Sequence, residues 1–104
     1  MTAKQALRKL GGEAKVSAFA TEVTNRHGVT VEIEPQINDE NPRDNWLDVL
    51  IETPNKLFDC NDRYSALDAA TAEVVEFLAK HGLNMEYECG GDGASGPIHS
   101  YRVY

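Results

Sequence analysis

The chain has 104 residues, 41% hydrophobic and 26% charged, a composition typical of one globular domain over residues 1–104 rather than of a disordered segment. Its net charge of −7 argues against DNA, RNA and anionic lipid as direct ligands, because those ligands require compensating Lys and Arg. No apolar run approaches the roughly 20 residues that cross a bilayer, and the N-terminus lacks the apolar segment of a signal peptide. We therefore expect a cytoplasmic protein that does not bind membranes.

The charge surplus is confined to one segment of the chain. Between positions 32 and 62, nine acidic residues oppose only Arg43 and Lys56, so this segment carries −7 and the remainder sums to zero. Such asymmetry determines which partners can approach which side of a protein. The nine acids are Glu32, Glu34, Asp39, Glu40, Asp44, Asp48, Glu52, Asp59 and Asp62.

Two helices are predicted at the start of the chain. Apolar side chains recur at helical spacing in Thr2–Leu10, and Gln5 stands three residues after Thr2, which is a capping-box pattern. About nine residues are too few for a stable isolated helix, so residues 1–12 either dock on the domain or fray. A longer helix is expected over Glu13–His27, ended by Gly28.

Two segments, Val29–Glu34 and Trp46–Thr53, alternate between apolar and polar residues as half-buried strands do. Pro35 ends the first strand or marks a sheet edge, and a polar loop is expected over Gln36–Asn45. Pro54 to Lys56 predicts a tight turn into a short third strand, Leu57–Cys60. The apolar side of the two long strands is expected to face the helices and consists of Val29, Val31, Ile33, Leu47, Val49 and Ile51.

The second half of the chain predicts a helix over Arg63–His81, stopped by Gly82 in a Schellman arrangement with Leu83. Strands are expected over Leu83–Cys89 and Ile98–Tyr104, joined by a flexible glycine-rich loop, Gly90–Pro97. The predicted fold is therefore α+β in the order α-α-β-β-β-α-β-β. An antiparallel sheet of four to five strands carries the long helix 63–81 on one face.

Motifs for metal, cofactor or nucleotide binding are absent from the sequence. The glycine-rich loop lacks the Lys of a phosphate-binding loop, and the histidines and cysteines have no metal-ligand spacing. We expect both cysteines to be reduced, half-buried apolar residues. The enzymatic alternative is a small Cys/His enzyme, in which Cys60 or Cys89 pairs with His99.

The acidic segment supplies the candidate site. If the apolar side of the strands faces the helices, then Glu32, Glu34, Asp48 and Glu52 share the opposite sheet face. Trp46 and Leu50 join them there, and the loop acids Asp39, Glu40 and Asp44 extend the surface. Trp46 is either the buried anchor of an interface or a side chain packed beneath the N-terminal helix.

The leading functional prediction is a non-enzymatic binding module whose acidic face engages a basic protein, expected to be a nucleic-acid-handling enzyme. Such a protein acts as an inhibitor or nucleic-acid mimic, and in general character it is similar to the small inhibitors that phages make against restriction or CRISPR systems. The alternative is a homo-oligomeric structural or adaptor domain, such as a homodimer formed through exposed strand edges and the C-terminal Tyr101 and Tyr104.

Overall fold

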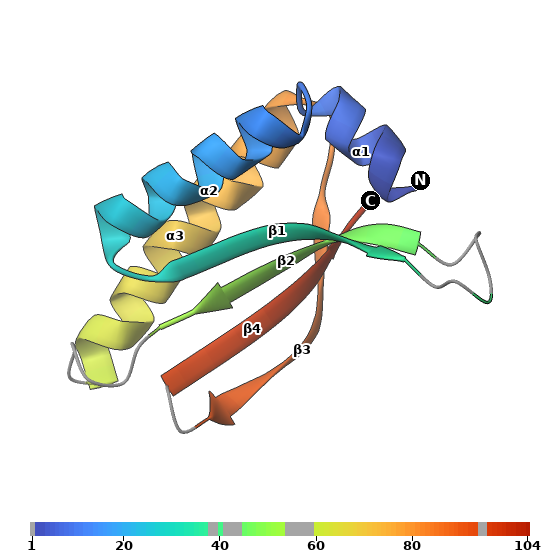
Figure 1. The fold of residues 1–104 in the computed structure, drawn as a ribbon. Coiled ribbons are helices and arrows are strands. Elements are labelled where there is room, and N and C mark those ends of the chain that lie inside the picture. Colours follow the sequence, from blue (N-terminus) through green and yellow to red (C-terminus); the bar gives the residue numbers. More distant parts are fainter. Residues whose placement is uncertain (1, 38–39, 41–44, 54–59, 94–95) are drawn as a thin grey trace.

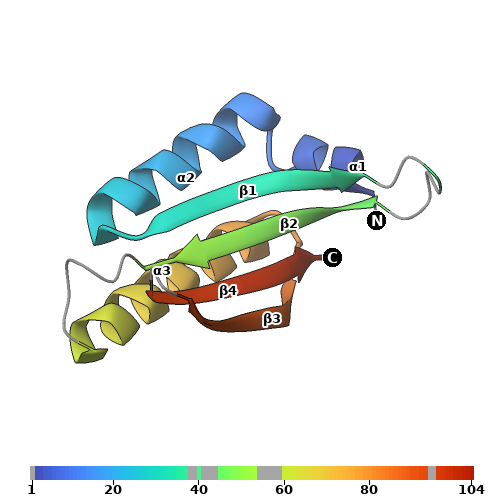
Figure 2. The ribbon, with the colours of Figure 1, turned by 60° about the horizontal axis from the view of Figure 1, so that its bottom comes forward.

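The computed structural model describes residues 2–37, 40, 45–53, 60–93 and 96–104. The elements are α1 (Ala3–Lys9), α2 (Glu13–His27), β1 (Thr30–Ile37), β2 (Asn45–Glu52), α3 (Cys60–Lys80), β3 (Met85–Gly93) and β4 (Gly96–Val103). Within the described residues the four strands form one sheet in the order β1-β2-β4-β3, antiparallel throughout, and all three helices lie on one of its faces (Figures 1 and 2). The α+β class is confirmed, with four strands.

The N-terminal helix docks on the domain. Thr2 and Gln5 form the predicted capping box, which satisfies backbone N–H groups that the first helical turn leaves free. Ala3 and Ala6 are buried, and the Ala3 N–H donates to Asn45 Oδ1 at 2.8 Å. This contact ties α1 to the start of β2, so a helix too short for independent stability is held in place by burial.

The strands bury the side that their alternation predicts. Leu47, Val49 and Ile51 are at most 1% exposed, and they pack with residues of all three helices in one core. The first strand is longer than expected, since β1 continues through Pro35 to Ile37. Because β1 is an outer strand, a residue without an N–H is tolerated there.

The predicted turn and most of the predicted third strand lie outside the described residues, which omit 54–59. The prediction of this strand is wrong at its last residue, because Cys60 is the first residue of α3. At the other end of this helix the Schellman arrangement is confirmed: the Leu83 N–H donates to the Leu78 carbonyl at 2.9 Å, and Gly82 has a φ of 75°. A positive φ at this position is accessible to glycine at little cost.

The glycine-rich segment is largely strand rather than loop. β3 runs on to Gly93 and β4 begins at Gly96, with residues 94–95 outside the described part. A bulge follows Tyr87 and shifts the register, so Cys89 pairs with Ser100. This extra residue moves Cys89 to the sheet face opposite the one that simple alternation predicts.

Cys89 also differs from expectation in burial, since it is free and exposed rather than half-buried. The side chain of Cys60 lies outside the described residues. None of the described helices has the length and apolar character needed to cross a membrane.

Candidate functional site

The sheet face turned away from the helices, here called the open face, is covered by no described segment (Figure 2). Strand alternation places the predicted acids of β1 and β2 on it. Glu32 and Glu34 are exposed, while Asp48 and Glu52 are partly exposed. The open face includes Glu32, Glu34, Trp46, Asp48, Leu50, Glu52, Glu86, Glu88, Cys89, Ser100 and Arg102.

The sheet register arranges charged residues of all four strands in one row across the open face. Glu34 of β1 is the direct cross-strand partner of Asp48 in β2. On its other side, Asp48 pairs with Arg102 of β4, which in turn pairs with Glu86 of β3. Like charges directly opposite one another destabilise a sheet, whereas the Arg102 guanidinium offsets part of that repulsion.

The surroundings of Asp48 disfavour its charged form. Burial raises the pKa of its carboxyl group, and the negative charge of Glu88 raises it further. Trp46, Ser100 and Arg102 oppose the increase without cancelling it. The ionised form of Asp48 is therefore less favourable in the folded protein than in water.

Trp46 lies on the open face with the predicted acids, and the side chain of Arg102 covers its ring. The guanidinium carbon of Arg102 lies 4.0 Å from the centroid of the Trp46 ring, a cation–π contact. Its Nε is 2.9 Å from Glu88 Oε1. The neighbouring Leu47, not Trp46, is the residue that packs in the core with α1. Trp46 thus lies on the open face beneath an arginine, rather than bare or under the N-terminal helix.

The structure brings together some of the predicted site residues and adds others. Glu40 is exposed in a turn, whereas Asp39 and Asp44 lie outside the described residues. Sequence reasoning missed Glu86 and Arg102 as members of this surface. Alternation within each C-terminal strand already separated them from the buried side, but the sequence does not show that β4 lies beside β2.

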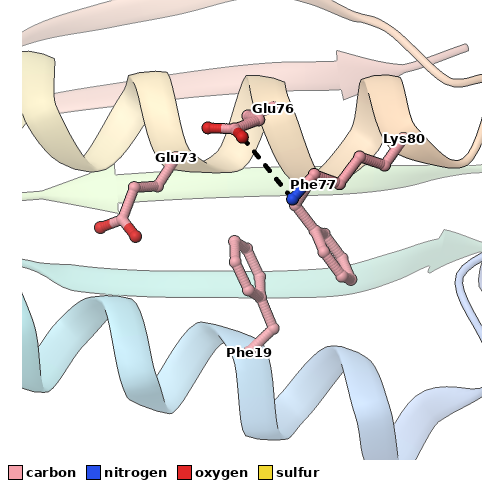
Figure 3. Close-up of a pocket in the computed structure, with 5 residues that line it drawn as sticks. All are labelled: Phe19, Glu73, Glu76, Phe77 and Lys80. Atoms are coloured by element: carbon pink, nitrogen blue, oxygen red, sulfur yellow. Dashed lines mark ion pairs between the residues drawn. The ribbon is translucent and has the colours of Figure 1, made fainter.

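A second candidate is a hollow of about 310 Å³ between α2 and α3 on the helical side (Figure 3). Its floor is formed by Phe19 and Phe77, whose rings stack with centroids 3.9 Å apart and planes inclined by 12°. The lining residues are Phe19, Glu73, Glu76, Phe77 and Lys80.

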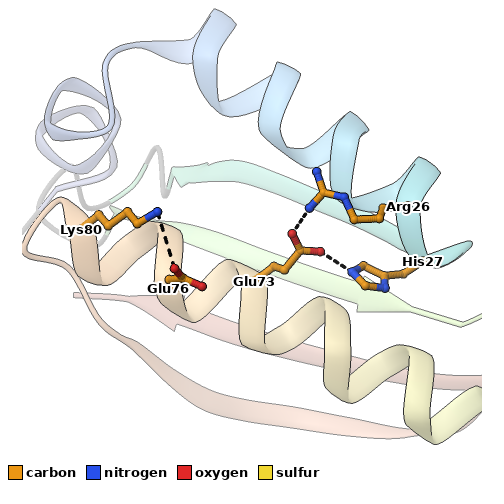
Figure 4. A network of polar contacts seen from close by, with 5 residues as sticks. All are labelled: Arg26, His27, Glu73, Glu76 and Lys80. Carbon is orange, nitrogen blue, oxygen red and sulfur yellow. Dashed lines mark hydrogen bonds and ion pairs between the residues drawn. The ribbon is translucent and has the colours of Figure 1, made fainter.

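The charged groups around this hollow contact one another rather than pointing at an empty site (Figure 4). Glu73 of α3 forms an ion pair with Arg26 and a hydrogen bond with the imidazole of His27, both in the last turn of α2. Lys80 Nζ lies 3.6 Å from Glu76 Oε1, one helical turn away. Cations at a helix C-terminus also complement its dipole. This cluster is best explained as a connection between two helices.

Of the two cysteines in the enzymatic alternative, only Cys89 can be placed relative to His99, because the side chain of Cys60 lies outside the described residues. His99 pairs with Gly90 and Ile51 on the helical side of the sheet, where its ring contacts Tyr87 and Tyr101. Cys89 lies on the open face. The two side chains are therefore not brought together as a nucleophile and its base would be. No group of three His, Cys, Asp or Glu in the described parts of the chain could hold a metal ion.

Comparisons with protein-family models, curated proteins and solved structures find no match for this chain. The structural features that bear on function are the open face, its row of charges and the strands at its two edges.

Proposed function

We propose that the protein is a non-enzymatic binding module whose open face engages a basic surface of another protein. The observation that supports this most directly is the cross-strand pair of Glu34 and Asp48 on an uncovered face. Charges that serve only solubility are usually interspersed in both signs. The open-face positions of β1 and β2 instead carry four acids and no base, namely Glu32, Glu34, Asp48 and Glu52.

A basic protein surface would relieve the repulsion that these carboxylates exert on one another. Lys and Arg from a partner would pair with exposed Glu32 and Glu34, and the partner's approach would be accelerated by the net charge of −7. Proteins that bind nucleic acid present such basic surfaces for phosphates. An inhibitor that competes with nucleic acid for one of these surfaces is the specific form of the proposal.

The test measures binding to a panel of purified basic nucleic-acid-binding proteins at low and high salt. In Glu32→Lys/Glu34→Lys, each substitution replaces an attraction by a repulsion, so affinity should fall by about tenfold or more, roughly 1.4 kcal/mol. The matched control is Glu22→Lys/Asp68→Lys, which makes the same charge change at exposed positions on α2 and α3. Binding that is insensitive to salt, or an equal loss in both variants, would contradict the proposal.

The alternative function, a homo-oligomeric structural domain, is favoured by one observation. Tyr87 and Tyr104 are each 55% exposed, and exposed aromatic side chains of this kind are enriched in the interfaces between protein subunits. Sedimentation velocity over a wide concentration range would decide between the two functions, since a strict monomer excludes the homo-oligomer.

A further inference from the structure

The outer edges of the sheet are formed by β1 and β3. An edge strand normally presents unpaired N–H and C=O groups that can pair with another chain. On β1 this capacity is reduced. The Val31 N–H points away from β2 and donates to Thr24 Oγ1 of α2 at 3.1 Å. Pro35 lies an even number of residues further along β1, so its backbone faces the same outer edge. Since proline has no N–H, it cannot donate a hydrogen bond there.

The edge of β3 is different. Asn84 and Tyr104 exchange two backbone hydrogen bonds, of 2.8 and 2.9 Å. Hydrogen-bonded pairs alternate with non-hydrogen-bonded pairs in an antiparallel ladder, so the backbone groups of Met85 and Tyr87 point away from β4. β3 lies at the end of the sheet, and among the described elements its only extensive contacts are with β4.

The side chains that flank this edge differ in character between the two faces. Glu86 and Glu88 lie on the open face. Tyr87 lies on the helical side, where its ring centroid is 5.6 Å from that of His99 and 5.7 Å from that of Tyr101. Gly90 makes this grouping possible, because a Cβ there would lie 2.5 Å from Tyr87 Oη and 2.8 Å from His99 Cδ2.

We propose that the free edge of β3 accepts an extended basic segment of the partner as a fifth strand. Alternate Lys or Arg side chains of that segment would face Glu86 and Glu88, and the intervening apolar side chains would pack on Tyr87. Main-chain hydrogen bonds to Met85 and Tyr87 supply the docking, and the alternating side chains supply the specificity. The inference rests on the proposed function, because the partner is the same basic protein.

A second copy of the chain fits this edge poorly. If two β3 strands paired about a two-fold axis, Glu86 and Glu88 of one copy would face the same carboxylates of the other. Like charges directly opposite are destabilising, and both copies carry a charge of −7. The carboxylates therefore select against self-pairing while they favour a basic strand, which is how specificity between competing partners arises.

The probe is a synthetic peptide of about six residues in which Lys or Arg alternates with Val or Tyr. Two isomers carry N-methyl groups on alternate amides, one isomer on the odd set and the other on the even set. Only one set of amides faces β3 in an added strand, so one isomer should bind like the parent and the other should not. Bound peptide should also slow the hydrogen exchange of the Met85 and Tyr87 amides. Capture by charge alone would leave both isomers equal and these amides unprotected.

Glu86→Lys should weaken binding of this peptide about tenfold, whereas Glu22→Lys, which makes the same charge change at an exposed position of α2, should have a much smaller effect. Glu86 is exposed, and circular dichroism would confirm that its variant folds. Equal binding of the isomers, or no peptide binding while basic proteins still bind through Glu32 and Glu34, overturns the edge proposal alone. If no basic protein binds either, the proposed function fails as well. Protection of the Met85 and Tyr87 amides that grows with protein concentration, without peptide, would assign the edge to a second copy and overturn the proposal.

Discussion

Removing the Arg102 side chain tests the central contact of the open face. Arg102→Ala eliminates the cation–π contact with Trp46, which contributes about 0.5–1 kcal/mol at a partly exposed site. It also eliminates the ion pair with Glu88, for which about 0.2–1 kcal/mol is typical. Both Arg102 and Glu88 are partly exposed, at 43% and 33%, so we expect the free energy of unfolding to fall by about 1 kcal/mol. For a domain of this size that corresponds to a melting temperature lower by about 4–8 °C.

The assay uses the intrinsic fluorescence of the protein, because Trp46 is its only tryptophan. Arg102→Ala should shift the Trp46 emission to longer wavelength and increase its quenching by acrylamide, since the ring becomes accessible to water. Arg102→Met keeps an apolar cover over the ring without charge, whereas Arg102→Lys keeps the charge without a planar guanidinium. We expect the Met variant to retain most of the protection from quenching and the Lys variant to retain less.

If Arg102→Ala left both the emission maximum and the quenching of Trp46 unchanged while circular dichroism showed an intact fold, Arg102 would not be the group that shields the ring from water. A double-mutant cycle with Trp46→Leu separates the direct contact between Arg102 and Trp46 from the repulsion among the neighbouring carboxylates that the loss of Arg102 leaves unbalanced. The coupling energy should be close to the cation–π value, and an absence of coupling would show that the two side chains act independently.

Three further perturbations test other parts of the structure. Leu78→Ala removes a side chain that is 0% exposed in the core and should lower the free energy of unfolding in urea by about 2–5 kcal/mol. Glu73→Gln removes the charge that pairs with Arg26 and weakens the contact with His27, and it should cost about 0.5–1 kcal/mol in the same measurement, less at high salt. Burial raises the pKa of Asp48 above its ordinary value of 3.8. At pH values between 3.8 and the raised pKa, the folded state therefore binds more protons than the unfolded state. The contribution of Asp48 to stability therefore decreases as pH rises through this window. Asp48→Asn should remove that dependence and stabilise the protein at neutral pH, as measured by urea unfolding at a series of pH values.

Local patterns predicted those parts of the fold in which neighbouring residues determine the structure. The capping box depends on Thr2 and Gln5 within one helical turn, and the boundaries of Glu13–His27 coincide with Gly12 and Gly28, which both have a positive φ. Burial of Val49 and Ile51 follows from simple alternation. In each of these cases, tertiary contacts reinforce what the local sequence prefers.

The remaining features depend on contacts between distant segments. The bulge after Tyr87 inverts the orientation of Cys89, and nothing in the local sequence distinguishes a regular strand from a bulged one there. The cover of Trp46 depends on β4 lying beside β2, so Arg102 reaches it from 56 positions further along the chain (102 − 46). Alternation assigns residues to faces but does not give the order of strands in the sheet.

The arrangement of charge on the open face supports the proposed binding surface over one that is only solvated. Solvation explains exposed acids such as Glu32, which is surrounded by water and costs the fold little. It does not explain Asp48, which lies opposite Glu34 and is disfavoured in its ionised form by burial and by Glu88. Sequences tend to depart from such local rules at functional sites, where a partner supplies the missing interaction. Neutralising Asp48 should therefore stabilise the free protein while weakening its complex with a basic partner, and this opposite pair of effects is not expected of a residue that serves solubility alone.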